Sequence, residues 1–162
     1  MFRRPSTPST FRRRAAAAVE LAVVMPVFVG ITFLAIESGH SLNMAQKLET
    51  AVRSGGRLAA KDVDTALLGS QTANEKVVTD IKNMLKADGF PVASVTVTIT
   101  HADGPTAGQT FDLSLTTNQY KLMRISASIP YSAISMFPLG MSPGNTIGAT
   151  LVQSRGRSTL NN

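Results

Sequence analysis

Cysteine is absent from this chain of 162 residues, and histidine occurs only twice. The lack of cysteine excludes disulfides, thiol catalysis and cysteine-based metal sites. His40 and His101 lie about sixty residues apart, and neither has a second metal-binding side chain three or four residues further along. Metal sites built on one helix need that spacing, so we expect no metal ion.

Recognisable catalytic motifs are also missing. The chain has no P-loop, no G-x-S-x-G and no G-x-G-x-x-G sequence, and these are the motifs that hold a phosphate or a nucleophile between a strand and a helix. The Gly55-Gly56 pair lies within a helical pattern instead. Asp62 and Asp64 follow Lys61 at the end of that pattern, where capping or solvation is their ordinary role. We therefore expect no enzyme, no catalytic residue and no cofactor.

Acidic residues are absent ahead of Glu20, whereas five arginines lie in that N-terminal flank. The whole chain has a net charge of +6, from 16 basic and 10 acidic residues. Without the five arginines, eleven basic residues stand against ten acids, so the rest of the chain is nearly neutral. Nucleic-acid binding needs a basic stripe with interleaved aromatics. The rest of the chain has neither, so no nucleic-acid partner is expected.

The longest hydrophobic run covers residues 15–36, and Glu20 is its only charge. A run of about 20 apolar residues is long enough to cross a bilayer as one helix. An ionised carboxylate inside that helix costs about 2.5 kcal/mol or more unless something compensates it. Either Glu20 lies shallow, near the headgroups and Arg14, or it has a partner in the membrane. Pro26 is expected to kink the helix, because it removes one backbone hydrogen bond.

The basic residues next to this run predict its orientation. Arg12, Arg13 and Arg14 precede it, and the positive-inside rule therefore places the N-terminus in the cytoplasm. We expect three parts along the chain: a basic cytoplasmic leader (1–14), a transmembrane helix (15–38) and an exported head (39–162).

A cleaved secretory signal is the alternative explanation for this N-terminal region. The apolar core of such a signal has about 7–15 residues and ends near an A-x-A site. The run in this chain is longer, Glu20 and Pro26 interrupt it, and no convincing A-x-A site follows. A retained helix is therefore favoured, and it would make the protein a single-pass membrane protein.

Hydrophobic spacing predicts two helices in the exported head. Apolar residues three to four positions apart continue the membrane helix over residues 41–61. A second helix is expected over residues 74–88, with Thr72 or Asn74 as its cap and Gly89 at its end.

Alternation of apolar and polar residues predicts a sheet after the second helix. The apolar loop 132–145 either covers this sheet or offers a contact surface. Two helices followed by an antiparallel sheet of three or four strands indicate an α+β head on a long membrane helix. The expected strands are about 92–100, 109–115, 122–131 and 146–154.

The N-terminal third of the chain resembles the TadE-like family, the pseudopilins of the tight-adherence (Tad, or Flp) pilus system. Residues 14–26, RAAAAVELAVVMP, are similar to the segment that begins the family pattern. Residues 36–39, IESG, are similar to its acidic-glycine exit, and residues 51–60, AVRSGGRLAA, to its following helix. The resemblance covers about residues 12–60.

The resemblance implies a role for Glu20. In type IV pilin-like proteins a prepilin peptidase cuts ahead of the helix and leaves a glutamate as the fifth residue, and here that cut would fall between Ala15 and Ala16. A neighbouring subunit's Glu20 would then neutralise the new amine on Ala16 and align the packed helices. Family members usually have a glycine or similar small residue before the cut, whereas here three arginines precede Ala15. A cut after Arg14 would make Glu20 the sixth residue.

Two functions of different classes follow from these observations. The first is a minor pilin or pseudopilin of a Tad-type pilus, in the inner membrane of a bacterium. Its partners would be the lipid bilayer, other pilins, the prepilin peptidase and the assembly platform. The second is a membrane-tethered exported domain that binds a ligand or partner through its sheet or its apolar loop, with the helix as a plain anchor.

Overall fold

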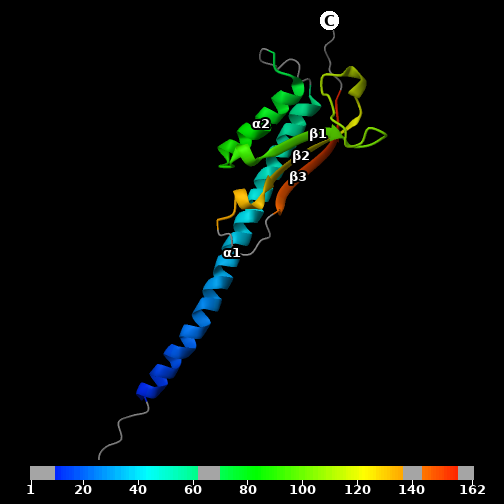
Figure 1. Ribbon diagram of the computed structural model, residues 1–162. Coiled ribbons are helices and arrows are strands. Elements are labelled where there is room, and N and C mark those ends of the chain that lie inside the picture. The colour runs from blue at the N-terminus through cyan, green and yellow to red at the C-terminus, as the bar shows by residue number, and fades with distance from the viewer. Residues whose placement is uncertain (1–9, 62–69, 137–143, 157–162) are drawn as a thin grey trace, which may run out of the picture. The chain divides into compact units, whose positions relative to one another are not determined.

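The computed structural model describes residues 10–61, 70–136 and 144–156 (Figure 1). The chain divides into two compact units, Met1–Gly39 and His40–Asn162, and each is described by itself. A single helix, α1 (Thr10–Ala60), contributes to both units.

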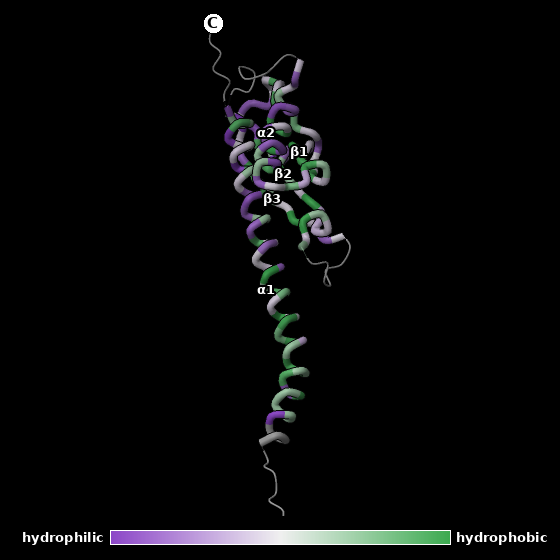
Figure 2. The backbone as a smooth tube through the Cα atoms, turned by 90° about the vertical axis from the view of Figure 1, so that its left-hand side faces the viewer, coloured by the Kyte–Doolittle hydropathy of each residue, from purple (hydrophilic) through white to green (hydrophobic). Residues whose placement is uncertain are grey.

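Over its described residues, the first unit consists of α1 alone. Four consecutive alanines, residues 15–18, favour the helix because alanine has the highest intrinsic helix propensity. The helix continues through Pro26. Figure 2 shows most of this stretch in the hydrophobic colour. The expected membrane helix and the expected helix over residues 41–61 are therefore parts of one element.

The second unit, which we call the head, is an α+β domain, as the sequence predicted. It combines the last part of α1 with α2 (Ala73–Ala87) and an antiparallel sheet in the order β1-β2-β3. The strands are β1 (Thr96–His101), β2 (Leu122–Pro130) and β3 (Thr146–Ser154).

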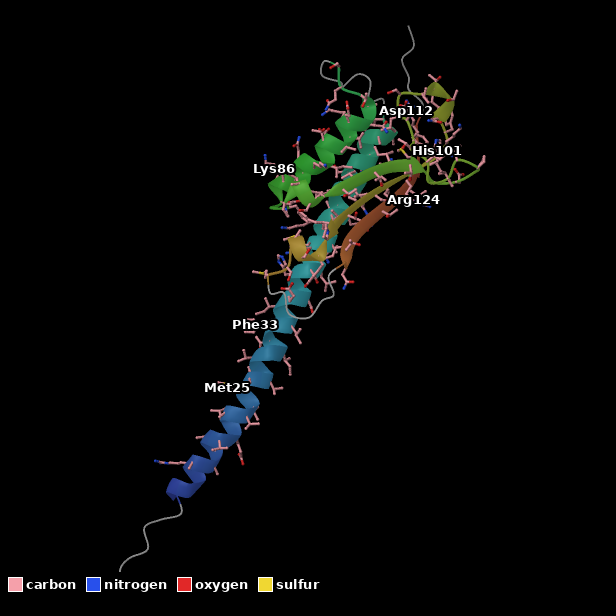
Figure 3. The ribbon with its side chains drawn as sticks, in the orientation of Figure 1. Met25, Phe33, Lys86, His101, Asp112 and Arg124 are labelled. Carbon is pink, nitrogen blue, oxygen red and sulfur yellow. The ribbon has the colours of Figure 1, made fainter. Side chains whose placement is uncertain are left out.

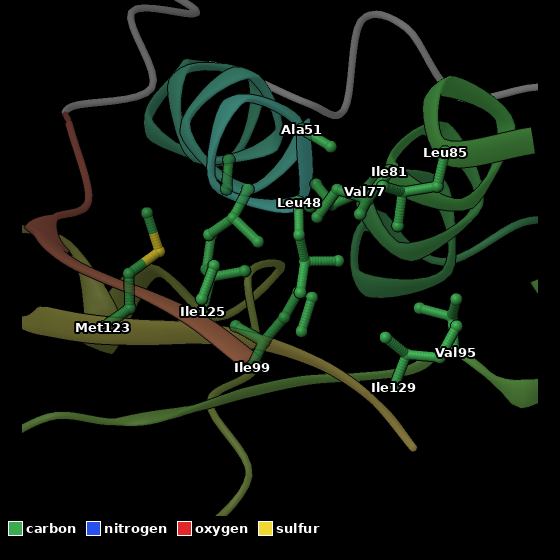
Figure 4. Packing of buried hydrophobic residues seen from close by; sticks show 14 of the residues in the cluster. Leu48, Ala51, Val77, Ile81, Leu85, Val95, Ile99, Met123, Ile125 and Ile129 are labelled. Carbon is green, nitrogen blue, oxygen red and sulfur yellow. The ribbon is translucent and has the colours of Figure 1, made fainter. Parts of the chain in front are cut away.

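One face of the sheet packs on the two helices and forms the core (Figure 4). Alternate residues of β2 are buried, and their neighbours face away from the helices. The side chains of this core cluster are apolar, and their burial provides the main driving force for folding of the head. Its fully buried side chains include Leu48 and Val52 of α1, Val77, Ile81 and Leu85 of α2, and Met123, Ile125 and Ile129 of β2.

The Gly55-Gly56 pair marks the closest packing around α1. A Cβ atom placed on Gly55 would overlap the Ile81 side chain of α2. A Cβ atom on Gly56 would overlap Leu151 of β3. Glycine at both positions lets a helix and a strand approach the α1 backbone, which outweighs the low helix propensity of glycine.

The predicted strand over residues 109–115 is wrong. Thr110 forms only an isolated bridge with Thr100, and residues 109–115 contain no strand. The Asn74 side chain donates to the carbonyl of Phe111 at 2.7 Å and accepts from the N–H of Leu113 at 2.8 Å. A side chain from α2 thus takes the place of a neighbouring strand, and the segment leaves the sheet.

The bounds of the remaining elements differ slightly from the predicted ones. Val92–Ser94, at the start of the predicted strand 92–100, is a 3-10 turn, and β1 begins at Thr96. Tyr131 belongs to another 3-10 turn, η4 (Tyr131–Ala133), that follows β2. Residues 137–143 of the predicted apolar loop lie outside the described residues.

Hydrogen bonds tie both ends of the β2–β3 hairpin to α1 within the head. The His40 ring, through Nε2, bonds to the carbonyl oxygen of Ile134 at 2.9 Å. At the other end, the N–H of Gly156 donates to the carbonyl of Ala60 at 3.1 Å. The connection between β2 and β3 therefore begins beside the residue at which α1 enters the head (Figure 1).

Candidate functional site: the apolar part of α1

The apolar side chains of the first unit are exposed along α1. Val23, Val27 and Phe28 each expose more than three fifths of their surface, and Met25 is half exposed (Figure 3). Large contiguous apolar surfaces of this kind mark contacts with protein or membrane. By length and composition α1 is able to cross a membrane.

Glu20 interrupts this surface. Its side chain is exposed, and neither of the ion pairs seen among the described residues, Arg53–Glu49 and Lys76–Asp80, includes it. The positions one turn away on α1 are alanine or valine, residues 16, 17, 23 and 24, so α1 supplies no cation at the spacing that stabilises helical ion pairs. Within the described part of α1, Glu20 therefore has no cation one turn away.

The residues of the expected peptidase site lie on the first turns of α1. The helix begins at Thr10, so the Ala15–Ala16 peptide bond lies inside it. Arg14 is exposed, and Arg12 and Arg13 belong to the same helix. Helix ends fray readily, and cleavage at this bond requires the first two turns to unwind.

Pro26 lies in the middle of the apolar stretch. Because proline has no N–H, the carbonyl of Ala22 lacks its usual helical donor. Six residues further on, the Thr32 hydroxyl donates to the carbonyl of Phe28 at 2.9 Å. The kink expected at Pro26 stays a prediction.

The first part of α1 also has a recognisable sequence pattern. Residues 15–57 match the model of a known protein family. That family is described as TadE-like protein. The match confirms the resemblance inferred from the sequence, and it spans the apolar run together with most of the α1 residues in the head. No curated protein and no solved structure matches the chain significantly.

Several polar side chains of the head stabilise its fold. Thr72 and Glu75 cap α2 reciprocally: the N–H of Thr72 donates to the Glu75 carboxylate at 2.9 Å, and the N–H of Glu75 donates to the Thr72 hydroxyl at 3.2 Å. The bonds from the Thr72 backbone and side chain lower the pKa of Glu75. The T-x-x-E spacing of this capping box was visible in the sequence.

A shallow pocket of about 230 Å³ lies beside this cap, between the start of α2 and residues 110–114. Two of the side chains that line it already have backbone partners: Asn74 bonds to the backbone at Phe111 and Leu113, and Asp112 accepts from the N–H of Ser114 at 2.8 Å. Among the described residues, no three His, Asp or Glu side chains gather closely enough to hold a metal ion.

Sequence reasoning missed the long-range contact of His40. Its bond to Ile134 joins residues 94 positions apart, and no local pattern signals such a partner. Arg155 was missed as well: it is buried and donates through Nη1 to the carbonyl of Leu115 at 2.6 Å.

Proposed function

We propose that this protein is a membrane-anchored minor pilin or pseudopilin that contributes to the assembly of a Tad-type pilus without catalysing a reaction. The observation that carries the proposal is the TadE-like match over residues 15–57, because it includes the exposed apolar run 15–36 of α1, in which Glu20 is the one acid. The protein resides in the bacterial inner membrane with its N-terminus in the cytoplasm and its head exported. Its partners are the bilayer, other pilins, the prepilin peptidase and the assembly platform.

Glu20 supplies the chemistry of assembly in this proposal. A carboxylate inside the bilayer is costly on its own, and α1 offers no cation one turn away. Cleavage between Ala15 and Ala16 creates an amine on Ala16 close to the membrane boundary. Pairing of that amine with Glu20 of a neighbouring subunit compensates both charges and sets the register of the two helices.

The first test is mass spectrometry of the N-terminus of the protein purified from native membranes. A mature chain that starts at Ala16 is the expected result. A start at Ala15 would make Glu20 the sixth residue and shift the proposed register by one position. A chain that still starts at Met1 would contradict processing and favour the membrane-tethered binding domain.

The second test removes the acid. Glu20→Ala is expected to leave membrane insertion intact and to abolish co-assembly with other pilins, while Glu20→Asp is expected to give an intermediate loss, because it keeps the charge on a shorter side chain. The measurements are pilus formation and co-purification with other pilins. Asp103→Ala is the control, since Asp103 is an exposed acid in the head. Unchanged pilus formation in Glu20→Ala would refute the pairing.

A further inference from the structure

The two ends of the head differ sharply in charge. Residues 125–154, which include most of β2 and all of β3, contain no Asp, Glu, Lys, Arg or His. Figure 3 shows Asp112, His101 and Arg124 at one end of the sheet. The connection between β2 and β3 leaves from the other end, where Pro130 pairs with Thr146. The end of β2 and the start of β3, which we call the neutral end, therefore carry no ionisable side chain, whereas Arg124 and His101 lie at the opposite end of the sheet.

The neutral end adjoins the start of α1 in the head. The 2.9 Å bond between His40 Nε2 and the carbonyl of Ile134 holds the segment after η4 beside His40. His40 follows the apolar run almost directly, because it lies about 6 Å beyond Ile36 along a helix that rises 1.5 Å per residue. Leu42 lies about 9 Å beyond Ile36 on the same scale.

These distances are comparable with the thickness of a headgroup layer. A bilayer has a hydrocarbon core of about 30 Å, and its headgroup regions extend the total to about 40–45 Å. If residues 15–36 span the core, His40 and the segment bonded to it lie at the depth of the headgroups. Two apolar side chains of this region are exposed: Met136 to 57% and Leu42 to 64%.

We propose that the neutral end of the head rests on the outer surface of the bilayer, with Met136 at the boundary between headgroups and acyl chains. This second membrane contact depends on the membrane anchoring in the proposed function, and it needs no pilus partner. A lipid surface fits this end because Met136 and Leu42 are exposed apolar side chains and residues 125–154 contain no charged side chain that must be desolvated. The contact fixes the depth of the head independently of other subunits.

The absence of tryptophan from the chain allows a direct test. Three single-tryptophan variants of the full chain are reconstituted at low density in phosphatidylcholine vesicles, with lipids brominated either near the headgroup or deep in the acyl chain. Met136→Trp probes the contact. Leu115→Trp is the matched control, because Leu115 is 51% exposed and bonds to Arg155 at the charged end. Phe28→Trp reports insertion of α1.

Met136→Trp is expected to have blue-shifted emission that shallow bromines quench more strongly than deep ones. Leu115→Trp is expected to emit as in water and to remain unquenched, and Phe28→Trp is expected to be quenched by deep bromines. Quenching of Met136→Trp should not change with salt, because no charge is involved. Near-UV circular dichroism checks that each head is folded.

The unfavourable outcomes are distinct. If Met136→Trp behaves like Leu115→Trp while Phe28→Trp is quenched, the second contact is refuted and the anchor stands. If Phe28→Trp is not quenched, the anchor itself is refuted and the proposed function with it. Blue-shifted emission that bromines do not quench and that grows with protein density would mean that another subunit covers Met136, which also overturns the lipid contact.

Discussion

The two parts of α1 have similar helical geometry and very different surroundings. Between residues 14 and 36 its large apolar side chains are largely exposed, as Leu34 is to 56%. Within the head, Leu48 is completely buried between α2 and the sheet. The comparison teaches that helix formation alone does not reveal what a side chain contacts: the first part has its apolar surface available for a membrane, and the second has already buried its own.

The largest expected difference comes from one substitution made in both parts. Leu48→Ala should lower the free energy of unfolding of the head by about 2–5 kcal/mol, because it leaves a cavity in the core. Leu34→Ala should leave that free energy unchanged, since the side chain contributes nothing to the core. Urea unfolding in detergent, monitored by near-UV circular dichroism, measures the free energy of unfolding of both variants. The signal reports on the head, because both tyrosines, Tyr120 and Tyr131, lie there. Equal losses would contradict the separation of the two parts.

Glycine substitutions should have a smaller effect on the head. Gly55→Ala is expected to destabilise it by about 1–3 kcal/mol through overpacking against Ile81. Gly30→Ala should leave the head's stability unchanged, because a Cβ at Gly30 meets nothing within 4 Å. The midpoint temperature of thermal unfolding, compared with that of the wild type, measures the effect of each substitution.

A double variant sharpens the glycine comparison. Ile81→Val shortens the side chain that a Cβ on Gly55 would meet, so the loss in Gly55→Ala/Ile81→Val should be smaller than the sum of the two single losses. Simple additivity would show that the contact between α1 and α2 is not the cause of the destabilisation.

The smallest expected effect concerns the cap of α2. Thr72→Ala should cost about 1 kcal/mol, as is typical for loss of a capping hydroxyl. The pKa of Glu75 is lowered from 4.5 in the folded state, so its contribution is present above that value and is lost as the pH falls through the folded pKa. The stability difference between the wild type and Thr72→Ala should therefore shrink in acid.

Thr50→Ala serves as the control for this cap. Thr50 is exposed on α1, and its hydroxyl only donates to the carbonyl of Gln46 within the same helix. Its substitution should have little effect on stability at any pH. Urea titrations between neutral pH and pH 3 compare the two variants, and a difference that stays constant in acid would argue against the Glu75 contribution.

The fold was predictable wherever the pattern is local. The apolar periodicity of α2 and the alternation in β2 and β3 depend on neighbouring residues, and the structure places these elements within one or two residues of the predicted positions. Residues 109–115 also alternate, yet they form no strand. The Asn74 side chain bonds to the backbone carbonyl of Phe111, which a neighbouring strand would otherwise bind, and it lies 37 residues before Phe111. Alternation of apolar and polar residues cannot reveal such a competing side chain.

The candidate site follows the same division. Glu20, Pro26 and the arginines before the apolar run are visible in the sequence because they interrupt or flank a continuous hydrophobic segment. The membrane-facing role proposed for Met136 could not be predicted in that way, since it depends on the bond between His40 and Ile134. From the sequence alone, the loop after β2 had two possible roles: it could cover the sheet or offer a contact surface.

By itself, the sequence determined that the chain has a basic flank, an apolar run with a single acid and an α+β head, because composition and periodicity are properties of consecutive residues. Only the tertiary structure decided which glycines admit close packing, that Asn74 keeps residues 109–115 out of the sheet, and that the neutral end of the head adjoins the start of α1. Each of these depends on contacts between residues far apart in the chain, and such contacts leave no local pattern.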